Sequence, residues 1–245
     1  MDLGSTEITY CGHAAFALTL ESGKRWIIDP WLEQNPACPT RLKNPAHVDT
    51  LLITHAHYDH IGDVLRLAHK HDATCVGIYE TVAWLQKKGV KNIVGFNKGG
   101  TAVVDGVKVT MTHAVHSCGI SDGDDIVYGG EAAGYVLTLS NGVRLYHAGD
   151  TCVFSDMKLI GEIMKPDIAL LPIGDFYTMD PLQAAYAIRM LGVKWVVPMH
   201  YATFPVLTGT PEKLRELTSD IQGLHILDIK PGETLSGELK QLEHA

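Results

Sequence analysis

The chain of 245 residues predicts an α/β fold that forms a single domain over residues 1–245. Short β-rich segments separated by turns fill the N-terminal third, and segments with strand and helix periodicity alternate after it. Hydrophobic residues make up 46% of the chain and charged residues 20%, which is typical of a protein with a packed core. No repeat, low-complexity stretch or linker divides the sequence, so one domain is expected.

The N-terminal third predicts three strands, over residues 7–10, 15–20 and 25–28, with a hairpin turn between the last two. The segment from Glu33 to Pro45 holds three prolines and shows no periodicity, which predicts a loop or flap. Two interpretations of this loop stay open. It forms one wall of a substrate cleft, or it is an inert surface excursion.

The rest of the chain alternates strands with helices. A strand over residues 47–54 is followed directly by a helix, and a strand over 74–78 by a helix over 79–88. Asn141-Gly142 predicts a hairpin between strands 134–139 and 143–146, and Thr210-Pro211 predicts the start of a helix. The other expected elements are strands 91–94, 101–104, 107–115, 168–171, 195–199, 224–227 and 233–235, and helices 155–164 and 181–191.

Composition and charge exclude several classes of protein. A net charge of −8 and the absence of a long Lys/Arg run argue against binding to nucleic acid or anionic membranes. No apolar run is long enough to span a bilayer, and the acidic start predicts no secretory signal. The five scattered cysteines contain no Cys-x-x-Cys pair and suit reduced thiols. A cytoplasmic protein is therefore expected.

The segment from Ile53 to Gly62 is the most informative stretch of the sequence. It places three histidines and an aspartate within six residues, between an apolar strand and a helix. His55 and His57 point to the same side of an extended segment, whereas Asp59 and His60 lie on the turn into the helix. This spacing predicts two adjacent sets of metal ligands. The alternative interpretation is a polar turn with solvated histidines.

Further ligands are available where predicted strands end. His116 follows the strand at 107–115, Asp150 follows the hairpin, and His200 follows the strand at 195–199. Neutral imidazole and carboxylate are ligand types that first-row divalent ions prefer, and strand ends are positions from which a rigid scaffold displays a site. These residues extend the predicted metal site.

The pattern His-x-His-x-Asp-His, followed by a His, a Gly-Asp and a late His, resembles the metallo-β-lactamase superfamily. Further motifs are similar to an uncharacterised metal-dependent hydrolase family close to the ascorbate-6-phosphate lactonases, and they cover nearly the whole chain. They are Gly12-His13, Ile28-Asp29-Pro30, His116-Ser117, His147-Ala148-Gly149-Asp150-Thr151, Phe154-Ser155-Asp156-Met157, Leu171-Pro172-Ile173-Gly174-Asp175 and Val197-Pro198-Met199-His200-Tyr201. Ser117-Cys118 and the segment 174–178 depart from the family pattern.

The resemblance implies an αβ/βα four-layer sandwich with two divalent ions, Zn or Mn with Fe also acceptable, in a cleft at the ends of the sheets. One ion would be held by His55, His57 and His116. The other would be held by Asp59, His60 and His200, with Asp150 bridging the two. It also makes a homo-oligomer conceivable. Of the seven ligands, Asp59, Asp150 and His200 are expected to contribute directly to catalysis.

Two such ions lower the pKa of a shared water, so the expected reaction is attack by a metal-bridging hydroxide on a small-molecule ester, lactone or phosphodiester. A nuclease or phosphodiesterase acting on nucleotides or RNA is the second hypothesis, which the acidic charge disfavours. An oxygen-reducing di-iron protein would need an appended flavin domain for which the chain is too short. A non-catalytic binding module would be expected to have lost ligands, whereas all seven are present.

Other polar residues are candidates for supporting roles. Asp29 is the first candidate to accept a hydrogen bond from a metal-binding imidazole, and Asp175 the second; Asp29 otherwise only begins a turn. His13, His147 and Tyr201 are candidates to line the pocket or orient a ligand. His113 is expected to be a core histidine, although it or His147 could replace an assigned ligand. Cys11, Cys118 and Cys152 are expected to be small buried side chains packed under the site, with a thiolate ligand to zinc as the alternative. A surface position is expected for His47, His69, His71, His225 and His244.

Overall fold

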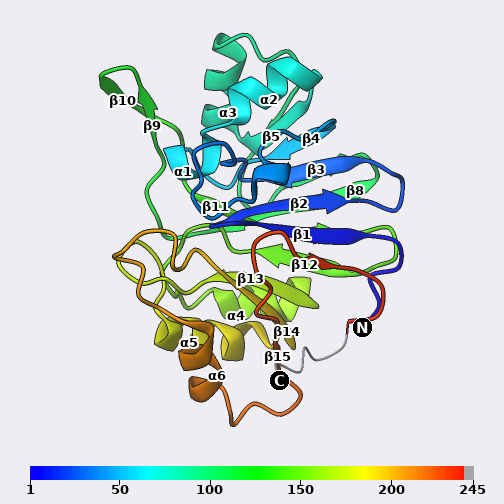
Figure 1. The fold of residues 1–245 in the computed structure, drawn as a ribbon, viewed down its shortest axis with the longest axis vertical. Coiled ribbons are helices and arrows are strands. Elements are labelled where there is room, and N and C mark those ends of the chain that lie inside the picture. Colours follow the sequence, from blue (N-terminus) through cyan, green and yellow to red (C-terminus); the bar gives the residue numbers. More distant parts are fainter. Residues whose placement is uncertain (240–245) are drawn as a thin grey trace.

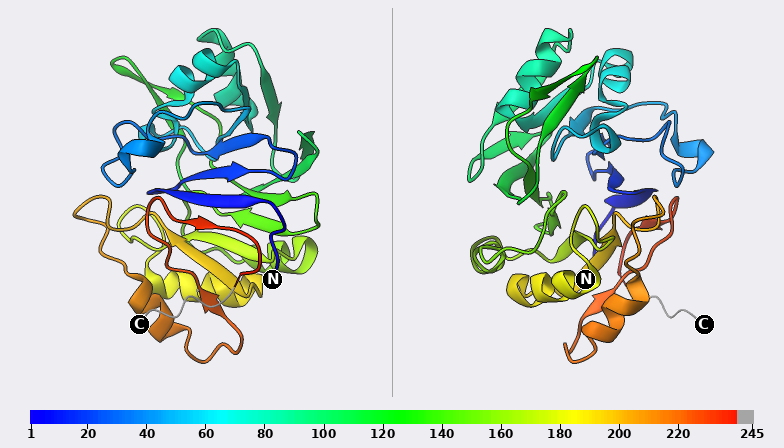
Figure 2. Two further views of the ribbon diagram at one scale, coloured as in Figure 1. Left: turned by 45° about the vertical axis from the view of Figure 1, so that its right-hand side comes forward. Right: turned by 90° about the vertical axis from the view of Figure 1, so that its left-hand side faces the viewer.

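The structure is a computed structural model that describes residues 1–239; residues 240–245, including His244, lie outside the described part. Two seven-stranded sheets pack face to face, and helices cover both outer faces (Figures 1 and 2). This arrangement confirms the expected αβ/βα sandwich.

The first sheet has the strand order β16-β1-β2-β3-β4-β5-β6. Strands β1 to β3 pair antiparallel, with the predicted hairpin between β2 and β3, and β3 to β6 pair parallel. The strands are β1 (Glu7–Gly12), β2 (Ala15–Thr19), β3 (Arg25–Ile28), β4 (Thr50–Leu52), β5 (Thr74–Ile78), β6 (Ile93–Phe96) and β16 (Thr234–Leu235).

The second sheet has the strand order β15-β14-β13-β12-β11-β8-β7. Strands β7, β8, β11 and β12 pair antiparallel, and β12 to β15 pair parallel. The strands are β7 (Thr101–Val104), β8 (Val107–His113), β11 (Ala133–Thr138), β12 (Arg144–His147), β13 (Ile168–Pro172), β14 (Trp195–Met199) and β15 (His225–Ile226). The hairpin around Asn141-Gly142 is confirmed, with Gly142 at a φ of +87°.

Alternation along the strands explains the layers. Leu52 of β4 lies in the core between the two sheets, whereas its neighbour Leu51 packs against the outer helices. The helices α1 (Tyr58–Ile61), α2 (Val64–His71) and α3 (Tyr79–Lys87) cover the first sheet, and α4 (Met157–Leu159), α5 (Pro181–Leu191) and α6 (Pro211–Leu217) cover the second (Figure 1). None of the helices within residues 1–239 has the length and apolar character of a bilayer span.

The start of α6 is as expected from the sequence. The Thr210 hydroxyl accepts a hydrogen bond from the Lys213 amide at 3.2 Å, and Pro211 occupies the first helical position, where no backbone donor is needed. Helix α5 begins in the same way, with the Asp180 carboxylate accepting from the Gln183 amide at 2.7 Å.

The structure differs from the sequence prediction in several elements. The helix expected over 155–164 is the short α4 followed by a π-helical turn, η2 (Ile160–Met164), in which Gly161 lies against the Leu191 carbonyl of α5. The loop at 33–45 contains a 3-10 turn, η1 (Thr40–Leu42). A hairpin of β9 (Gly119–Asp122) and β10 (Asp125–Tyr128) was not expected, and it projects from the body beside α1 (Figure 1).

The prediction of a core position for His113 is wrong. His113 is exposed at the end of β8, where the alternation of the strand breaks because both Met111 and Thr112 are buried. Its Nδ1 lies 3.0 Å from the Lys98 ammonium.

Candidate metal centre

Segments at one end of both sheets bring the candidate ligands together. Each candidate ligand follows a strand, stands in the turn after one or lies on the short helix α1, and the fold thereby joins residues far apart in the sequence. His13 lies in the turn between β1 and β2, His55 and His57 follow β4, Asp59 and His60 lie on α1, His116 follows β8, Asp150 follows β12, and His200 follows β14.

Two of these histidines have unusual backbone conformations that are locked together. His13 has a φ of 60° and His200 a φ of 55°, a left-handed region that side chains other than glycine rarely adopt. The His200 amide donates a hydrogen bond to the His13 carbonyl at 2.8 Å, and the Tyr10 hydroxyl donates to the same oxygen at 3.0 Å. Such strain clusters at functional sites, where the surrounding structure holds it.

Three imidazoles converge at the open side of the centre, and we call His55, His57 and His116 the cleft set. Nδ1 of His57 lies 3.0 Å from Nε2 of His55 and 3.3 Å from Nε2 of His116. A tetrahedral site with Zn–N bonds of about 2.0–2.1 Å separates its ligand nitrogens by about 3.3 Å. The spacing of the cleft set fits one such ion.

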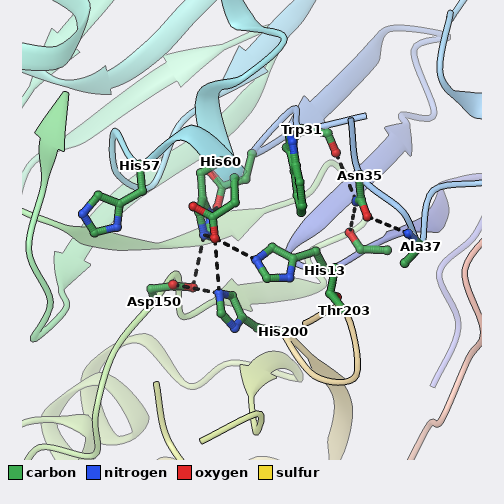
Figure 3. A network of polar contacts seen from close by, with 12 residues as sticks. His13, Trp31, Asn35, Ala37, His57, His60, Asp150, His200 and Thr203 are labelled. Carbon is green, nitrogen blue, oxygen red and sulfur yellow. Dashed lines mark hydrogen bonds and ion pairs between the residues drawn. The ribbon is translucent and has the colours of Figure 1, made fainter. Parts of the chain in front are cut away.

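A second group lies deeper, and we call His13, Asp59, His60 and His200 the buried set; Figure 3 labels its three histidines. Oδ2 of Asp59 lies 3.0 Å from Nε2 of His13, 3.9 Å from Nε2 of His60 and 3.8 Å from Nε2 of His200. All three histidines are fully buried. One oxygen and three nitrogens therefore face a common point.

Asp150 lies between the two sets. Its Oδ2 is 3.9 Å from Nε2 of His55 and 3.7 Å from Nε2 of His116, both in the cleft set. The same carboxylate lies 3.0 Å from Nε2 of His200 and 3.4 Å from Nε2 of His60, in the buried set (Figure 3). A single side chain thus reaches both groups.

Three buried polar atoms at this point make ion-pair contacts within the site but no hydrogen bond of good geometry among residues 1–239. They are Nε2 of His60, Nε2 of His200 and Oδ1 of Asp150. Buried polar atoms are nearly always satisfied, since leaving one unpaired costs about 1–3 kcal/mol. Cations held by the two sets would satisfy all three atoms, so the residues present fit a pair of divalent ions.

Hydrogen bonds from the other ring nitrogens orient the ligands. Nδ1 of His60 lies 2.8 Å from Oδ2 of Asp29, whose carboxylate also accepts from the amide and hydroxyl of Thr54. Nδ1 of His55 contacts the Thr54 hydroxyl at 3.1 Å. Asp29 is fully buried, and its contact with His60 is of the kind that orients a metal-binding imidazole.

The two sets differ in charge. Burial lowers the pKa of His55, and His60 adds to this effect; burial also lowers the pKa of His57 and His116. Burial acts in the same direction on His200, but Asp150 outweighs it and raises the His200 pKa to about 9. Asp150 and Asp29 likewise raise the pKa of His60. The cleft set is thus neutral at pH 7, whereas His60 and His200 of the buried set hold protons; burial lowers the pKa of His13, the third histidine of that set, to about 4.

His13 and His147, two further candidate residues, lie in different parts of the site. His13, expected to line the pocket, is a member of the buried set. His147 is buried, with Nε2 3.0 Å from the Ala14 carbonyl and Nδ1 accepting from the Gly149 amide, so it supports the turn that carries Asp150.

Asp175 and Tyr201 do not contact the ligands. Asp175 is exposed and accepts from the Phe176 amide at 2.7 Å, so the expected hydrogen bond to a metal-binding imidazole is not made. The Tyr201 hydroxyl donates to Asp228 at 3.0 Å. Both residues lie in turns after strands, and sequence position alone did not reveal the direction of their side chains.

The cysteines pack as expected at two of three positions. Cys11 and Cys118 are buried among apolar side chains, and Cys152 is half-buried; none of the five cysteines forms a disulfide. Burial raises the pKa of the Cys11 thiol to about 12, so this thiol stays protonated.

A cleft of about 510 Å³ opens over His57 and His116 of the cleft set, Asp59 of the buried set and Asp150. No residue of the loop 33–45 lines it; the loop packs behind the site instead, where the buried Asn35 amide donates to the carbonyls of Gly12 and Trp31. No role was predicted from the sequence for the three aromatic residues that line this cleft. They are exposed or half-buried, and they lie in loops or at the start of a helix. The lining residues are His57, Tyr58, Asp59, His116, Ser117, Ser121, Asp150, Tyr177 and Phe204.

Comparison with known proteins identifies the family. Residues 24–201 match the Beta-lactamase superfamily domain. The chain belongs to the metallo-β-lactamase superfamily. It is 56% identical to a UPF0173 metal-dependent hydrolase of Koribacter versatilis, covering 96% of this chain and all of that protein. A relative of the same description from Rubrobacter xylanophilus is 50% identical, covering 95% and 97%. The chain is therefore a metal-dependent hydrolase of the UPF0173 family.

Solved structures agree with this assignment. Igni18, a metallo hydrolase from the archaeon Ignicoccus hospitalis, superposes with a TM-score of 0.85 at 37% identity, covering 96% of this chain and 100% of that chain. An isothiocyanate hydrolase from Delia radicum gut bacteria has a TM-score of 0.69 at 25% identity, covering 94% and 98%. The predicted superfamily, fold and enzyme class are confirmed, while the likeness to ascorbate-6-phosphate lactonases stays a prediction.

Proposed function

We propose that this hydrolase uses two divalent ions, Zn or Mn with Fe also acceptable, to hydrolyse an ester or lactone of a small molecule. The observation that carries the proposal is the position of Asp150, whose carboxylate lies within 4 Å of ligand nitrogens from both sets. When bound, such ions supply Lewis acidity and lower the pKa of a coordinated water.

The chain's own residues provide the remaining requirements. His55, His57 and His116 would hold one ion beside the open cleft, and Asp59, His60 and His200 the other, with Asp150 shared. His13 either joins the buried set as a ligand or fixes the Asp59 carboxylate through their 3.0 Å contact. Asp29 holds the His60 ring in one orientation, so the nitrogen that faces Asp150 is available as a ligand.

Phosphodiester hydrolysis is the second candidate, because a dinuclear centre suits phosphoryl chemistry equally well. The charge around the cleft weighs against it. No Lys or Arg is among the residues that line the cleft within the described chain, whereas nucleotide and RNA substrates carry phosphates that need cationic partners. Because the chain is similar to an isothiocyanate hydrolase, a neutral isothiocyanate is a further substrate to test.

The experiment is a comparison of purified wild-type protein with Asp150→Asn, each depleted of metal and reloaded with Zn or Mn. Substrates are phenyl acetate, γ-butyrolactone, phenyl isothiocyanate and bis(4-nitrophenyl) phosphate. His69→Ala is the matched control, since His69 is exposed on α2 outside both sets. Metal-dependent hydrolysis of the ester or lactone, lost in Asp150→Asn alone, supports the proposal. Hydrolysis of the phosphodiester alone would replace it with the second candidate.

A further inference from the structure

The mouth of the cleft is aromatic. Tyr58 and Tyr177 are 56% and 53% exposed, and Phe204 lines the same cleft. Trp31 is buried behind them, with its ring centroid 5.9 Å from that of Tyr58 and 5.7 Å from that of Phe204. Aromatic side chains left this open at a concave site offer ring faces and edges to a flat apolar partner.

A hydrogen-bonded turn with two left-handed residues holds Tyr177 at the mouth of the cleft. Asp175 and Phe176 adopt consecutive left-handed conformations, with φ of 68° and 58°. The Asp175 amide donates to the Met179 carbonyl at 3.0 Å, and the Asp175 side chain accepts from the Phe176 amide. The Phe176 ring packs edge-on against Tyr177 with centroids 4.7 Å apart. This turn sets the position of Tyr177.

Charge at the mouth is negative or absent. Asp59 and Asp150 are the only charged side chains among the described lining residues apart from histidines. The β9–β10 hairpin supplies Ser121 to the lining and carries three aspartates next to it, at positions 122, 124 and 125, of which Asp122 is paired with Lys88. An anionic group held away from the reacting carbon would find no cationic side chain there.

We propose that the cleft takes a neutral substrate whose non-reacting part is an aromatic or similarly flat apolar group, held among Tyr58, Tyr177 and Phe204. The inference rests on the hydrolase function proposed above and narrows its substrate class. It disfavours lactones and esters that carry a phosphate or carboxylate at a distance from the scissile bond. Water adds to the carbonyl carbon, the ester C–O bond breaks, and the products are an acid and a neutral alcohol.

The test compares three esters with the metal-loaded protein: 2-naphthyl acetate, the same ester with a sulfonate on its distal ring, and ethyl acetate. Each kcat/KM is divided by the rate of hydroxide-catalysed hydrolysis, so that leaving-group reactivity cancels. We expect the neutral naphthyl ester to be preferred over its sulfonated form by about tenfold or more. Equal or faster hydrolysis of the sulfonated ester overturns the inference.

Variants locate the preference in the aromatic mouth. Tyr177→Ala and Phe204→Ala should each lower kcat/KM for 2-naphthyl acetate by about 2- to 12-fold, the size of one aromatic contact, and change ethyl acetate less than about twofold. Tyr186→Ala is the matched control, because Tyr186 is 60% exposed on α5 and lines no part of this cleft. Equal losses on both neutral esters would mean that the rings do not select the substrate.

A binding measurement separates this inference from the proposed function. If the metal-loaded protein hydrolyses none of the three esters, ester hydrolysis is wrong, and the mouth is judged by fluorescence titration with 2-naphthol and its sulfonated form. Tighter binding of 2-naphthol that weakens in Tyr177→Ala and Phe204→Ala still supports a neutral aromatic ligand. If 2-naphthol binds no more tightly than its sulfonated form, the inference of a neutral aromatic ligand is wrong.

Discussion

The cleft set and the buried set lie at the same end of the two sheets, but they differ in residue types and in burial. The cleft set consists only of imidazoles, of which the half-buried His57 and His116 line the open cleft and His55 is fully buried. The buried set includes a carboxylate and three fully buried histidines, two of them in left-handed conformations. The difference teaches that one half is arranged for access by substrate, while the other is fixed by the surrounding structure.

The orienting contacts follow the same division. In the buried set, His60 contacts the fully buried Asp29 carboxylate at 2.8 Å. In the cleft set, the only outward partner of His57 among the described residues is the Ser117 hydroxyl at 3.2 Å. A buried charge-assisted contact is stronger than a partly exposed neutral one. Substitutions in the two halves should therefore differ in size.

The largest effect is expected where the halves meet. Asp150→Asn removes the charge that both sets share, and kcat should fall on the order of 10³-fold, beyond the 10- to 100-fold loss typical of an outer orienting residue. Bound metal should fall with it, as measured by elemental analysis of the dialysed protein. Retention of two ions and full activity would show that Asp150 is not shared.

A smaller effect is expected from the orienting residue of the buried set. Asp29→Asn keeps an acceptor for Thr54 but removes the charge beside His60, so affinity for one of two ions should fall about 10- to 100-fold. Competition with a chelator measures this. Ser117→Ala is the matched change in the cleft set, and its loss should be smaller. If Ser117→Ala lost more metal affinity than Asp29→Asn, the cleft set would be the more rigid of the two sets, contrary to the assignment.

The charge difference predicts a pH dependence that distinguishes the sets. His60 and His200 have raised pKa values, so in protein stripped of metal these rings hold protons at pH 7, and metal binding must release them. Affinity of the buried set should rise about tenfold per pH unit for each proton released, up to the His200 pKa of about 9.

The cleft set provides the internal control for this pH dependence. Lowered pKa values leave His55, His57 and His116 neutral at pH 7, so their affinity should change little between pH 7 and 9. Calorimetric Zn titrations in two buffers of different ionisation enthalpy report the protons released at each step. Equal proton release at both steps would contradict the charge difference.

Much of this site could be predicted from the sequence because its signals are local. The segment His55 to His60 carries its ligands within one strand-to-helix turn, and the partner ligands stand directly after apolar strands. Asp29 follows a buried strand in the same way. Caps such as Thr210 with Pro211 also depend only on neighbouring residues and were correctly placed.

What could not be predicted depends on contacts between distant segments. His13 enters the buried set because its left-handed turn meets His200, which lies at the end of the other sheet. The aromatic mouth combines α1 with the loops after β13 and β14, which no local pattern joins. The β9–β10 hairpin is different, since Asp122-Gly123 is a hairpin signal that the sequence does contain.

The most direct test of the two-set centre is the number of metal ions per chain, measured by elemental analysis after reloading with Zn and exhaustive dialysis. The account predicts about two ions for the wild type. It predicts about one ion for His57→Ala, which opens the cleft set, and about one for His60→Ala, which opens the buried set. The control His69→Ala should keep two. One ion in the wild type, or loss of both ions in either single-set variant, would contradict two adjacent binding sites.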